Sequence, residues 1–300
     1  MIHHRNYLSK LLIPALFISL LVLNACKKDS PDEPNVEKEA SIRPFTPHSS
    51  AYVTQLLSYT PAPGQFINTP SGSMDAAKGI LKGKDGLVSL GFFGGSIVLG
   101  FDHTVLNRAG KDDLIIYNNS SVTFAEPGVV WVMQDKNNNG QPDDIWYELS
   151  GSAQNQTGYT NNYSITYIRP VTSISNVSWT DSKGNSGVVK TNMYHTQAYY
   201  PEWITADSYT LTGTLLPSTN INSSNPTFIT STPFTSGYAD NTPGGDKLDI
   251  ANAADEKGNK AALKGIDFIK IQTGIPFNAG WLGEMSTDVK GVADLSFAGI

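Results

Sequence analysis

The apolar residues of this chain come in short runs, each bounded by Gly, Asn, Asp, Ser or Pro. Runs of about four to eight residues rich in β-branched and aromatic side chains predict strands, and the residues between them predict tight turns. Helical periodicity predicts a helical turn only at residues 52–59 and 75–80. The pattern therefore predicts an all-β fold, a β-sandwich or jelly roll with few short helices. Expected strands lie at residues 87–90, 96–101, 114–117, 128–133, 145–149, 163–167, 174–179, 187–190, 208–213, 247–250 and 266–271.

Two turns share the pattern D-x-x-G-N, at residues 181–185 and 255–259. Asp, Gly and Asn are favoured in hairpin turns because they tolerate or stabilise left-handed backbone. No sequence period of about 20–50 residues is present, so the two segments predict matching hairpin turns and not a repeat architecture.

The N-terminus is typical of a secretory signal. Arg5 and Lys10 precede an apolar run at residues 11–23, and small residues follow it. The run is shorter than the ~20 apolar residues that a membrane-spanning helix needs, and Pro14 interrupts it. Residues 1–25 are therefore expected to be a cleaved leader.

Cys26 is the only cysteine in the chain and ends the tetrapeptide L-N-A-C. This tetrapeptide resembles the lipobox of bacterial lipoproteins, in which the cysteine sulfur carries a diacylglycerol. The resemblance implies a lipid anchor at Cys26, since acyl chains contribute roughly 0.8 kcal/mol per buried CH₂ to membrane binding. A plain secretory signal with an incidental cysteine is the alternative.

Residues 27–30, K-K-D-S, form a charged tract that resembles the surface-export signal of some Gram-negative lipoproteins. The polar, Pro-rich segment that contains it has too little apolar surface to fold by itself. Residues 26–49 are therefore expected to be a flexible tether, and residues 50–300 a single large β-sandwich domain. The predicted location is the outer membrane, with the protein lipid-anchored and exposed at the cell surface; the periplasmic face is the alternative.

The chain carries 21 basic and 27 acidic residues and a formal net charge of −6. It has no basic run, so its charge argues against nucleic-acid binding. With one cysteine it forms no internal disulfide, and its stability must come from the core and from any bound metal.

Several phrases of the body resemble a family of bacterial cell-surface lipoproteins that often occur beside PKD-type modules. They are GGSIVLGFDHTVLNRAGKDDLIIYNNS, FAEPGVVWVMQDKNNNGQPDDIWYELSGS, MYHTQAYYPEWI, GIDFIKIQTGI and GWLGEMSTDVKGVADL, within residues 85–295. More loosely they resemble the galactose-binding-like jelly roll. The resemblance implies a β-sandwich at the cell surface. Some members of the family are encoded near outer-membrane uptake systems, including those for corrinoids.

Residues 135–144, DKNNNGQPDD, match D-x-N-x-N-G-x-x-D, the first nine positions of an EF-hand-type loop. Trp146 occupies the position of the bidentate Glu, so Asp144 or Glu148 would have to supply that carboxylate, and a strand is expected to follow Pro142. Oxygen ligands favour a structural Ca²⁺, and a metal-free hairpin turn is the alternative. The predicted ligands are Asp135, Asn137, Asn139, Gln141, Asp143 and Asp144. A second acidic group, formed by Asp240, Asn241, Asp246 and Asp249, has no recognisable spacing and is expected to be a solvated loop.

Residues 194–203, YHTQAYYPEW, concentrate aromatic side chains around Pro201, and another Trp stands in the segment 278–284. Aromatic faces beside amides and carboxylates suit a sugar ring or another flat organic ligand. Packing of a long loop against the sandwich is the alternative. The predicted ligand-binding residues are His195, Tyr199, Tyr200, Trp203 and Trp281.

No HExxH or G-x-S-x-G motif is present. We therefore expect no enzyme activity and favour a surface-anchored ligand-binding module that captures a glycan or corrinoid for an outer-membrane transporter. A structural or adhesive envelope protein is the main alternative. A glycan hydrolase that uses a carboxylate pair such as Asp112–Asp113 or Asp143–Asp144 is less favoured.

Overall fold

The structure is a computed structural model that describes residues 41–297. The predicted leader, the predicted lipid-bearing Cys26 and residues 27–40 lie outside the described residues. Within the described part, no helix has the length and apolar character needed to cross a membrane.

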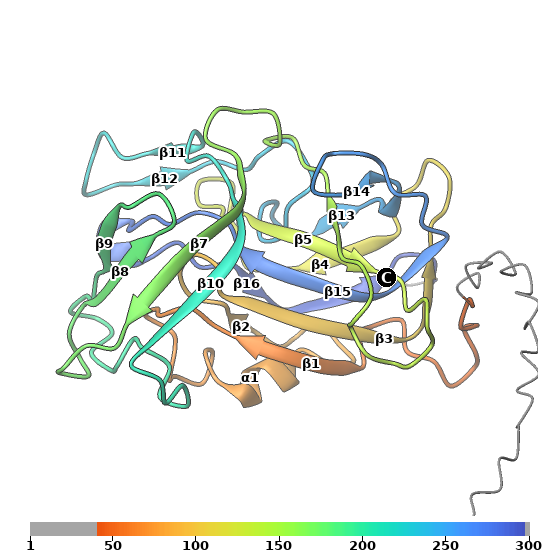
Figure 1. The fold of residues 1–300 in the computed structure, drawn as a ribbon, viewed down its shortest axis with the longest axis horizontal. Helices are drawn as coiled ribbons and strands as arrows, with labels where there is room; N and C mark the ends of the chain where they lie inside the picture. The colour runs from red at the N-terminus through yellow and green to blue at the C-terminus, as the bar shows by residue number, and fades with distance from the viewer. Residues whose placement is uncertain (1–40, 298–300) are drawn as a thin grey trace, which may run out of the picture. The chain divides into compact units, whose positions relative to one another are not determined.

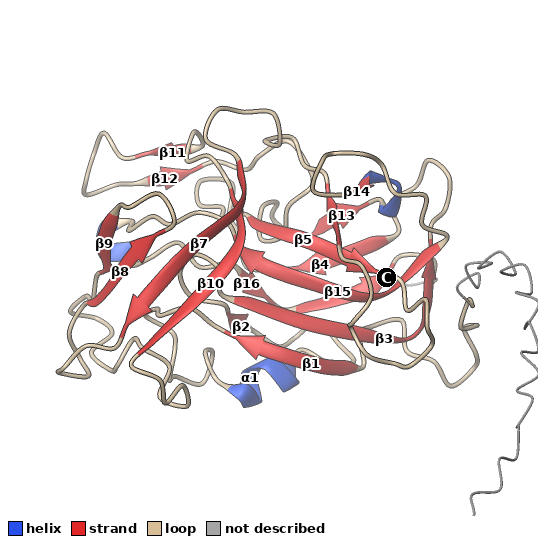
Figure 2. Ribbon diagram, in the orientation of Figure 1, coloured by secondary structure: helices blue, strands red, loops and turns tan. Residues whose placement is uncertain are grey.

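The largest sheet of the described chain is antiparallel throughout (Figures 1 and 2). Its strand order is β1-β3-β15-β5-β6-β14, so the long central strands β3 and β15 come from distant parts of the chain. The bounds are Gln55–Thr60 for β1, Ser96–Leu106 for β3, Gly265–Thr273 for β15, Gly128–Met133 for β5, Tyr147–Leu149 for β6 and Ala253–Ala254 for β14.

Smaller sheets cover both faces of this one. On one side lie β13 (Asp246–Leu248), β4 (Leu114–Tyr117) and β17 (Gly291–Asp294), together with the pair β2 (Val88–Ser89) and β16 (Asp288–Val289). A four-stranded sheet has the order β10-β7-β8-β9, and its long strands β7 and β10 run past the ends of β5 and β15 in Figure 1. Its bounds are Ser208–Leu215 for β10, Thr160–Ile168 for β7, Val177–Asp181 for β8 and Ser186–Val189 for β9. The short elements are β11 (Ile221–Asn222), β12 (Thr230–Ser231), the helix α1 (Met74–Gly79) and the 3₁₀ turns η1 (Ile250–Asn252) and η2 (Gly280–Leu282).

The main core follows from strand alternation, because every second residue of a strand points to the same face. Ile97, Leu99 and Phe101 of β3 are fully buried and belong to the same apolar cluster as Ile116 of β4 and Val292 of β17. Each such buried side chain contributes roughly 1.5–3 kcal/mol relative to exposure. Burial between two sheet layers thus confirms the predicted all-β, sandwich-like fold.

A second core lies under the four-stranded sheet. It contains Phe92 and Phe93 from the loop before β3, and Tyr163 and Tyr167 from β7. The Tyr167 hydroxyl donates to the Phe93 carbonyl at 2.6 Å, which satisfies a polar group that is fully buried. The four-stranded sheet is therefore fixed to the sandwich by an aromatic layer of its own.

The predicted strands are all present, with ends that differ by a few residues, and α1 confirms the helical turn predicted near residue 75. The helical turn predicted at residues 52–59 is wrong. This segment enters β1, which pairs with β3 through a bulge between Leu56 and Ser58. Edge pairing to a long central strand overrides the weak helical pattern of so short a segment.

Part of the predicted flexible tether also belongs to the fold. Arg43 forms an ion pair with buried Asp267 at 2.8 Å, and its carbonyl accepts from the Thr104 N–H at 2.9 Å. The Phe45 ring packs against His103, with ring centroids 5.1 Å apart. Structure therefore begins by Arg43, before the expected boundary at residue 50.

The two D-x-x-G-N turns have the same hydrogen bonds. Asp181 Oδ1 accepts from the Asn185 N–H at 2.7 Å, and Asp255 Oδ1 accepts from the Asn259 N–H at 2.8 Å. In both turns the Asn side-chain amide donates to the other carboxylate oxygen, and the Gly has a positive φ, 84° at Gly184. The prediction of matching turns is confirmed.

Candidate functional site

A row of three large polar or amphipathic side chains crosses the centre of the main sheet. Lys270 of β15 is the cross-strand partner of Trp131 of β5, and Trp131 is the partner of Glu148 of β6. Their strand neighbours Ile269, Ile271, Val130 and Val132 belong to the main core. Alternation therefore directs the three side chains to the opposite face, toward β7 and β10.

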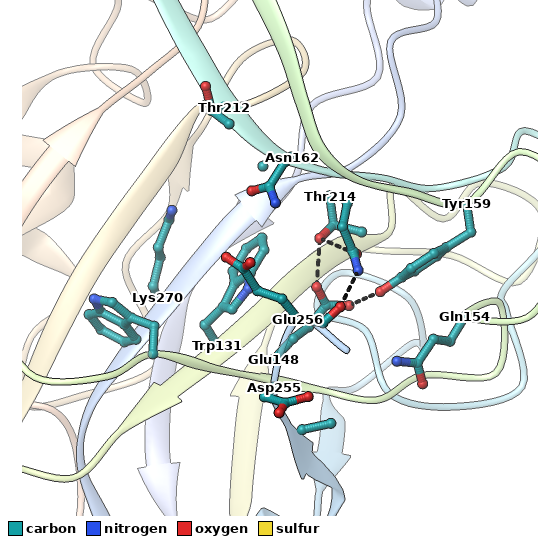
Figure 3. A pocket seen from close by; sticks show the side chains of 14 residues that line it. Trp131, Glu148, Gln154, Tyr159, Asn162, Thr212, Thr214, Asp255, Glu256 and Lys270 are labelled. Carbon is teal, nitrogen blue, oxygen red and sulfur yellow. Dashed lines mark hydrogen bonds between the residues drawn. The ribbon is translucent and has the colours of Figure 1, made fainter. Parts of the chain in front are cut away.

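This face of the sheet forms the floor of a pocket of about 180 Å³ (Figure 3). Strands β7 and β10 provide one wall, and the 255–259 turn and the segment after β6 complete the rim. The lining residues are Trp131, Trp146, Glu148, Gln154, Tyr159, Asn161, Asn162, Thr212, Gly213, Thr214, Ala254, Asp255, Glu256 and Lys270.

Glu148 is the most constrained polar group of the pocket. Its Oε1 accepts from the Tyr159 hydroxyl, and its Oε2 accepts from Thr214 Oγ1 at 2.6 Å, as Figure 3 shows. Burial raises the pKa of Glu148, while the two hydrogen bonds lower it in part. The carboxyl group is thus held in one orientation, with its ionisation shifted toward neutral pH.

Lys270 lies over the face of Trp131, with Nζ 4.8 Å from the ring centroid. Burial lowers the pKa of this amine. A cation over an indole contributes about 0.5–2 kcal/mol, more when it is desolvated. The pair fixes the Trp131 ring as a rigid part of the pocket floor.

The pocket therefore presents indole and phenol rings beside a fixed carboxyl group, an amine and side-chain amides. Such a combination binds a small ring that has both apolar faces and hydroxyl groups. The Asp255 carboxylate is not counted among the ligand-binding groups, because both of its oxygen atoms accept hydrogen bonds within its own turn, from Lys257 and Asn259. Glu256 is exposed at the rim.

The predicted calcium loop connects β5 to β6, so a strand follows Pro142 as expected. Asp135 is buried and accepts backbone N–H groups from Asn139 and Gly140 at 3.1 and 2.9 Å. The side-chain amides of Asn137 and Asn139 both donate to the carboxylate of Asp143, at 3.1 and 2.8 Å.

The side chains of Asn137, Asn139 and Asp143 thus meet within the loop, while Asp135 binds its backbone. Asn139 Oδ1 accepts from the Gln141 N–H at 2.7 Å, and Asp144 accepts from the Lys136 N–H at 2.8 Å. Rotation of the Asn137 and Asn139 side-chain amides by half a turn would present their oxygen atoms in place of nitrogen. The ligands would then all be oxygen atoms, which suits Ca²⁺ better than a transition metal. Its present hydrogen bonds are equally those of a closed Asn-rich turn.

None of the five residues of the predicted aromatic ligand surface lines the pocket. Tyr199 and Tyr200 are 0% and 2% exposed and belong to the second core, so for Tyr199 the loop-packing alternative holds. Tyr200 also borders a separate hollow, where its ring lies under the Arg169 guanidinium at 4.4 Å. This hollow has no other aromatic residue and no buried carboxylate.

The other three predicted residues have different ring and hydrogen-bond neighbours. The half-buried ring of His195 packs against Phe66, with ring centroids 4.9 Å apart. Trp203 is exposed beside Tyr59, and Trp281 is exposed with its Nε1 donating to the Thr227 carbonyl at 3.1 Å.

The second acidic group is not a solvated loop, as its composition had suggested. Asp240 and Asn241 are 0% and 1% exposed, and Asp246 is 5% exposed. Asp246 accepts backbone N–H groups from Asn241 and Thr242 and a side-chain amide from Asn118. Asp249 is half-buried and caps η1 by accepting from the Ala251 N–H at 2.8 Å. A short polar segment does not reveal such burial in the sequence.

No family model matches the chain, and no curated protein matches it. The sequence did not reveal the pocket because its residues are dispersed over six strands and three loops. The signal that was available is a Trp or Lys at an alternate position of an otherwise apolar strand, as in GVVWVM and FIKIQ.

Proposed function

We propose that this protein is a non-enzymatic binding module of the bacterial envelope that captures a glycan in the pocket above Trp131. The observation that supports this is the row of Lys270, Trp131 and Glu148, closed by Tyr159 and the amides of β7. Sugar rings stack on indole faces, and their hydroxyl groups pair with carboxylate and amide groups. The proposed ligand site therefore lies on the face of the main sheet and not in the aromatic segment at residues 194–203.

Size favours a glycan over a corrinoid. The pocket, at about 180 Å³, is smaller than the ~300–1,000 Å³ of pockets that enclose drug-sized ligands. One sugar residue fills such a space, whereas a corrin macrocycle exceeds it and would leave most of its surface outside. We therefore propose that the pocket holds a terminal or side-chain sugar of a larger glycan.

The proposal includes lipidation at Cys26 and a place on the outer membrane beside a transporter that takes up the captured ligand. The N-terminal sequence supports it. Labelling of cells with an alkyne-bearing palmitate tests the anchor: label should attach to the wild-type protein and be lost in Cys26→Ser. Retention of the label in that variant would refute the assignment.

Binding is measured by isothermal titration calorimetry with panels of neutral and acidic oligosaccharides and with a cobamide. We expect heat with at least one oligosaccharide. Central aromatic residues of an interface often contribute about 2 kcal/mol or more, so Trp131→Ala should weaken binding by roughly 30-fold. Trp281→Ala is the matched control, since it removes an exposed indole outside the pocket and should leave the affinity unchanged.

Three outcomes contradict the proposal. Heat with none of the ligands favours the structural or adhesive alternative. Binding that depends on Trp281 or Trp203 and not on Trp131 restores the aromatic loop as the site. Binding of the cobamide alone, with loss in Trp131→Ala, keeps the pocket but changes the ligand.

One observation favours a second candidate, a glycan hydrolase. A buried Glu with a raised pKa beside a sugar-sized pocket is what a general acid requires, and Glu148 has that environment. The second carboxylate would have to be Glu256 at the rim. Release of reducing ends from a bound glycan by the wild type but not by Glu148→Gln would establish this activity.

We also propose that the loop at residues 135–144 binds a structural Ca²⁺. The contacts of Asn137 and Asn139 with Asp143, and the hold of Asp135 on the loop backbone, support it. Ca²⁺ should raise the melting temperature of the wild type and raise it less in Asp135→Asn. An identical shift in both proteins would refute the assignment.

A further inference from the structure

A group of acidic side chains is buried between the loop after β4, the loop before β13 and the strand β16. Asp240 is 0% exposed and Asp288 is 4% exposed, and the Asp288 N–H donates to Asp240 Oδ2 at 2.8 Å. Glu284, 1% exposed, and half-buried Glu126 are close enough to add their negative charge to this region. Four carboxyl groups thus share one part of the interior.

These groups have no cationic partner. The ion pairs between described residues join Arg43 to Asp267, His103 to Asp102 and Asp294, and Arg108 to Asp113, all elsewhere in the fold. Unpaired buried charge is among the most unfavourable arrangements in a protein, with a cost of several kcal/mol per ion. Either protons or a cation must compensate it.

Both kinds of compensation act at the oxygen atoms that have no partner. Asp288 Oδ2 accepts from the Asn119 amide at 3.0 Å and Asp240 Oδ2 from the Asp288 N–H, but Oδ1 of each has no partner. Glu284 Oε2 also lacks one, although Oε1 accepts from the Gln65 N–H at 2.9 Å. One shared proton pairs at most two of these oxygen atoms, whereas a bound cation can take several of them as ligands at once.

We propose that a divalent cation binds between Asp240 and Asp288, through the Oδ1 atom that each leaves free. Carboxylate oxygens in an all-oxygen environment favour hard cations such as Ca²⁺ over copper, zinc or nickel. No three Asp, Glu, His or Cys side chains of residues 41–297 form a metal-binding group by themselves. Neutral oxygens, from carbonyl groups or water, must therefore complete the shell, as Ca²⁺ commonly allows.

Glu126 and Glu284 act on this site through their charge. Glu126 is half-buried, so this member of the group lies nearer the surface than Asp240 and Asp288. Asp240 adopts a left-handed backbone, with φ of 50°, which a non-glycine residue rarely does. The site is separate from the loop at residues 135–144, and it does not depend on glycan binding.

The experiment counts bound Ca²⁺ by native mass spectrometry on the purified full chain, first stripped with EDTA and then returned to Ca²⁺. Asp288→Asn is the test variant, because Asn keeps the size and removes the charge, and Asp135→Asn is the matched control in the other loop. We expect Asp288→Asn to bind one Ca²⁺ fewer than the wild type. Asp135→Asn must retain a Ca²⁺ that further substitution of Asp288 removes.

Terbium provides a second measurement. The Tyr59 hydroxyl donates to the Ser89 carbonyl at 2.7 Å, next to β16, and its raised pKa reflects burial and then the Asp288 charge. Tb³⁺ bound at the site should therefore show emission sensitised by Tyr59 that falls in Tyr59→Phe and is displaced by Ca²⁺. The terbium measurement does not use the Asp288→Asn variant, so it tests the site even if that variant fails to fold.

The proposal is overturned if the stripped wild type takes up no Ca²⁺, or if Asp288→Asn binds as many ions as the wild type. It is also overturned if Asp135→Asn alone abolishes all binding, because the only site would then be the loop. Loss of a Ca²⁺ in Asp288→Asn with an unchanged glycan affinity supports the cation site independently of the proposed function.

Discussion

Replacing Tyr159 by Phe tests whether Glu148 is ionised inside the pocket. The substitution keeps the ring and removes the hydroxyl that donates to Glu148 Oε1, so only Thr214 still donates to the carboxylate. A hydrogen bond to a charged group contributes about 1.5–3 kcal/mol, and one between neutral groups about 0.5–1.5 kcal/mol. Tyr159→Phe should therefore destabilise the fold more when Glu148 is ionised than when it is protonated.

The sign of the pH dependence follows from the raised pKa of Glu148. A carboxyl whose pKa is raised by folding contributes most stability below its unfolded value, and that contribution is lost as the pH rises through the folded value. Without the Tyr159 hydroxyl the folded pKa moves higher still. The destabilisation should therefore grow from about 1 kcal/mol under acid conditions to about 2 kcal/mol above the folded pKa.

The assay is urea unfolding of the wild type and Tyr159→Phe between about pH 4 and about pH 9. Tyr147→Phe is the matched control, because Tyr147 is half-buried on β6 and its hydroxyl makes no hydrogen bond to a described residue. In a Glu148→Gln background the pH dependence of Tyr159→Phe should disappear. A destabilisation that is constant with pH, or one that survives in that background, would refute the reasoning.

Other consequences of the fold are testable in the same way. Burial is the largest influence on the pKa of His103 and lowers it, but hydrogen bonds and charge from its two carboxylate partners outweigh it and raise the pKa above 6.5. The stability from this group is therefore complete below 6.5 and lost as the pH rises through the folded value, and His103→Gln should remove that decline in urea titrations. Gly91 has a φ of +73°, and an added Cβ would lie 2.1 Å from the Ala62 carbonyl oxygen, so Gly91→Ala should prevent stable folding. Gly110 has a φ of +66° with open space around it, so Gly110→Ala should cost only about 1–2 kcal/mol by thermal melting; equal effects of the two would contradict this.

The sequence predicted the strands well because their signal is local. Alternation in GVVWVM predicts which side chains face the core, and the residue types of a turn such as DSKGN predict its backbone conformation. It did not predict β1, because the segment 52–59 becomes a strand only by pairing with β3. Local sequence periodicity does not show which distant strand a segment will pair with.

The same limit applied to the pocket. Alternation alone places Trp131 and Lys270 on the outer face of the sheet, but only the register brings Lys270, Trp131 and Glu148 into one row. The dense aromatic segment around Tyr199 was predicted to bind a ligand, yet Tyr199 and Tyr200 pack in the second core, whereas Trp203 is exposed. Aromatic density in sequence does not distinguish a binding surface from a hydrophobic interior, because both use large apolar rings.

The floor and the wall of the pocket belong to different hydrophobic cores. Trp131 and Lys270 stand on the main sheet, whereas β7 and β10 are held by the aromatic layer around Tyr167. Gln272 ties the two together, since its amide donates to the Thr212 carbonyl at 3.1 Å and to the Gly94 carbonyl at 2.9 Å. The spacing between floor and wall is thus set by packing remote from the ligand, so repacking beneath β7 offers a route to a new ligand size that leaves every contact residue unchanged.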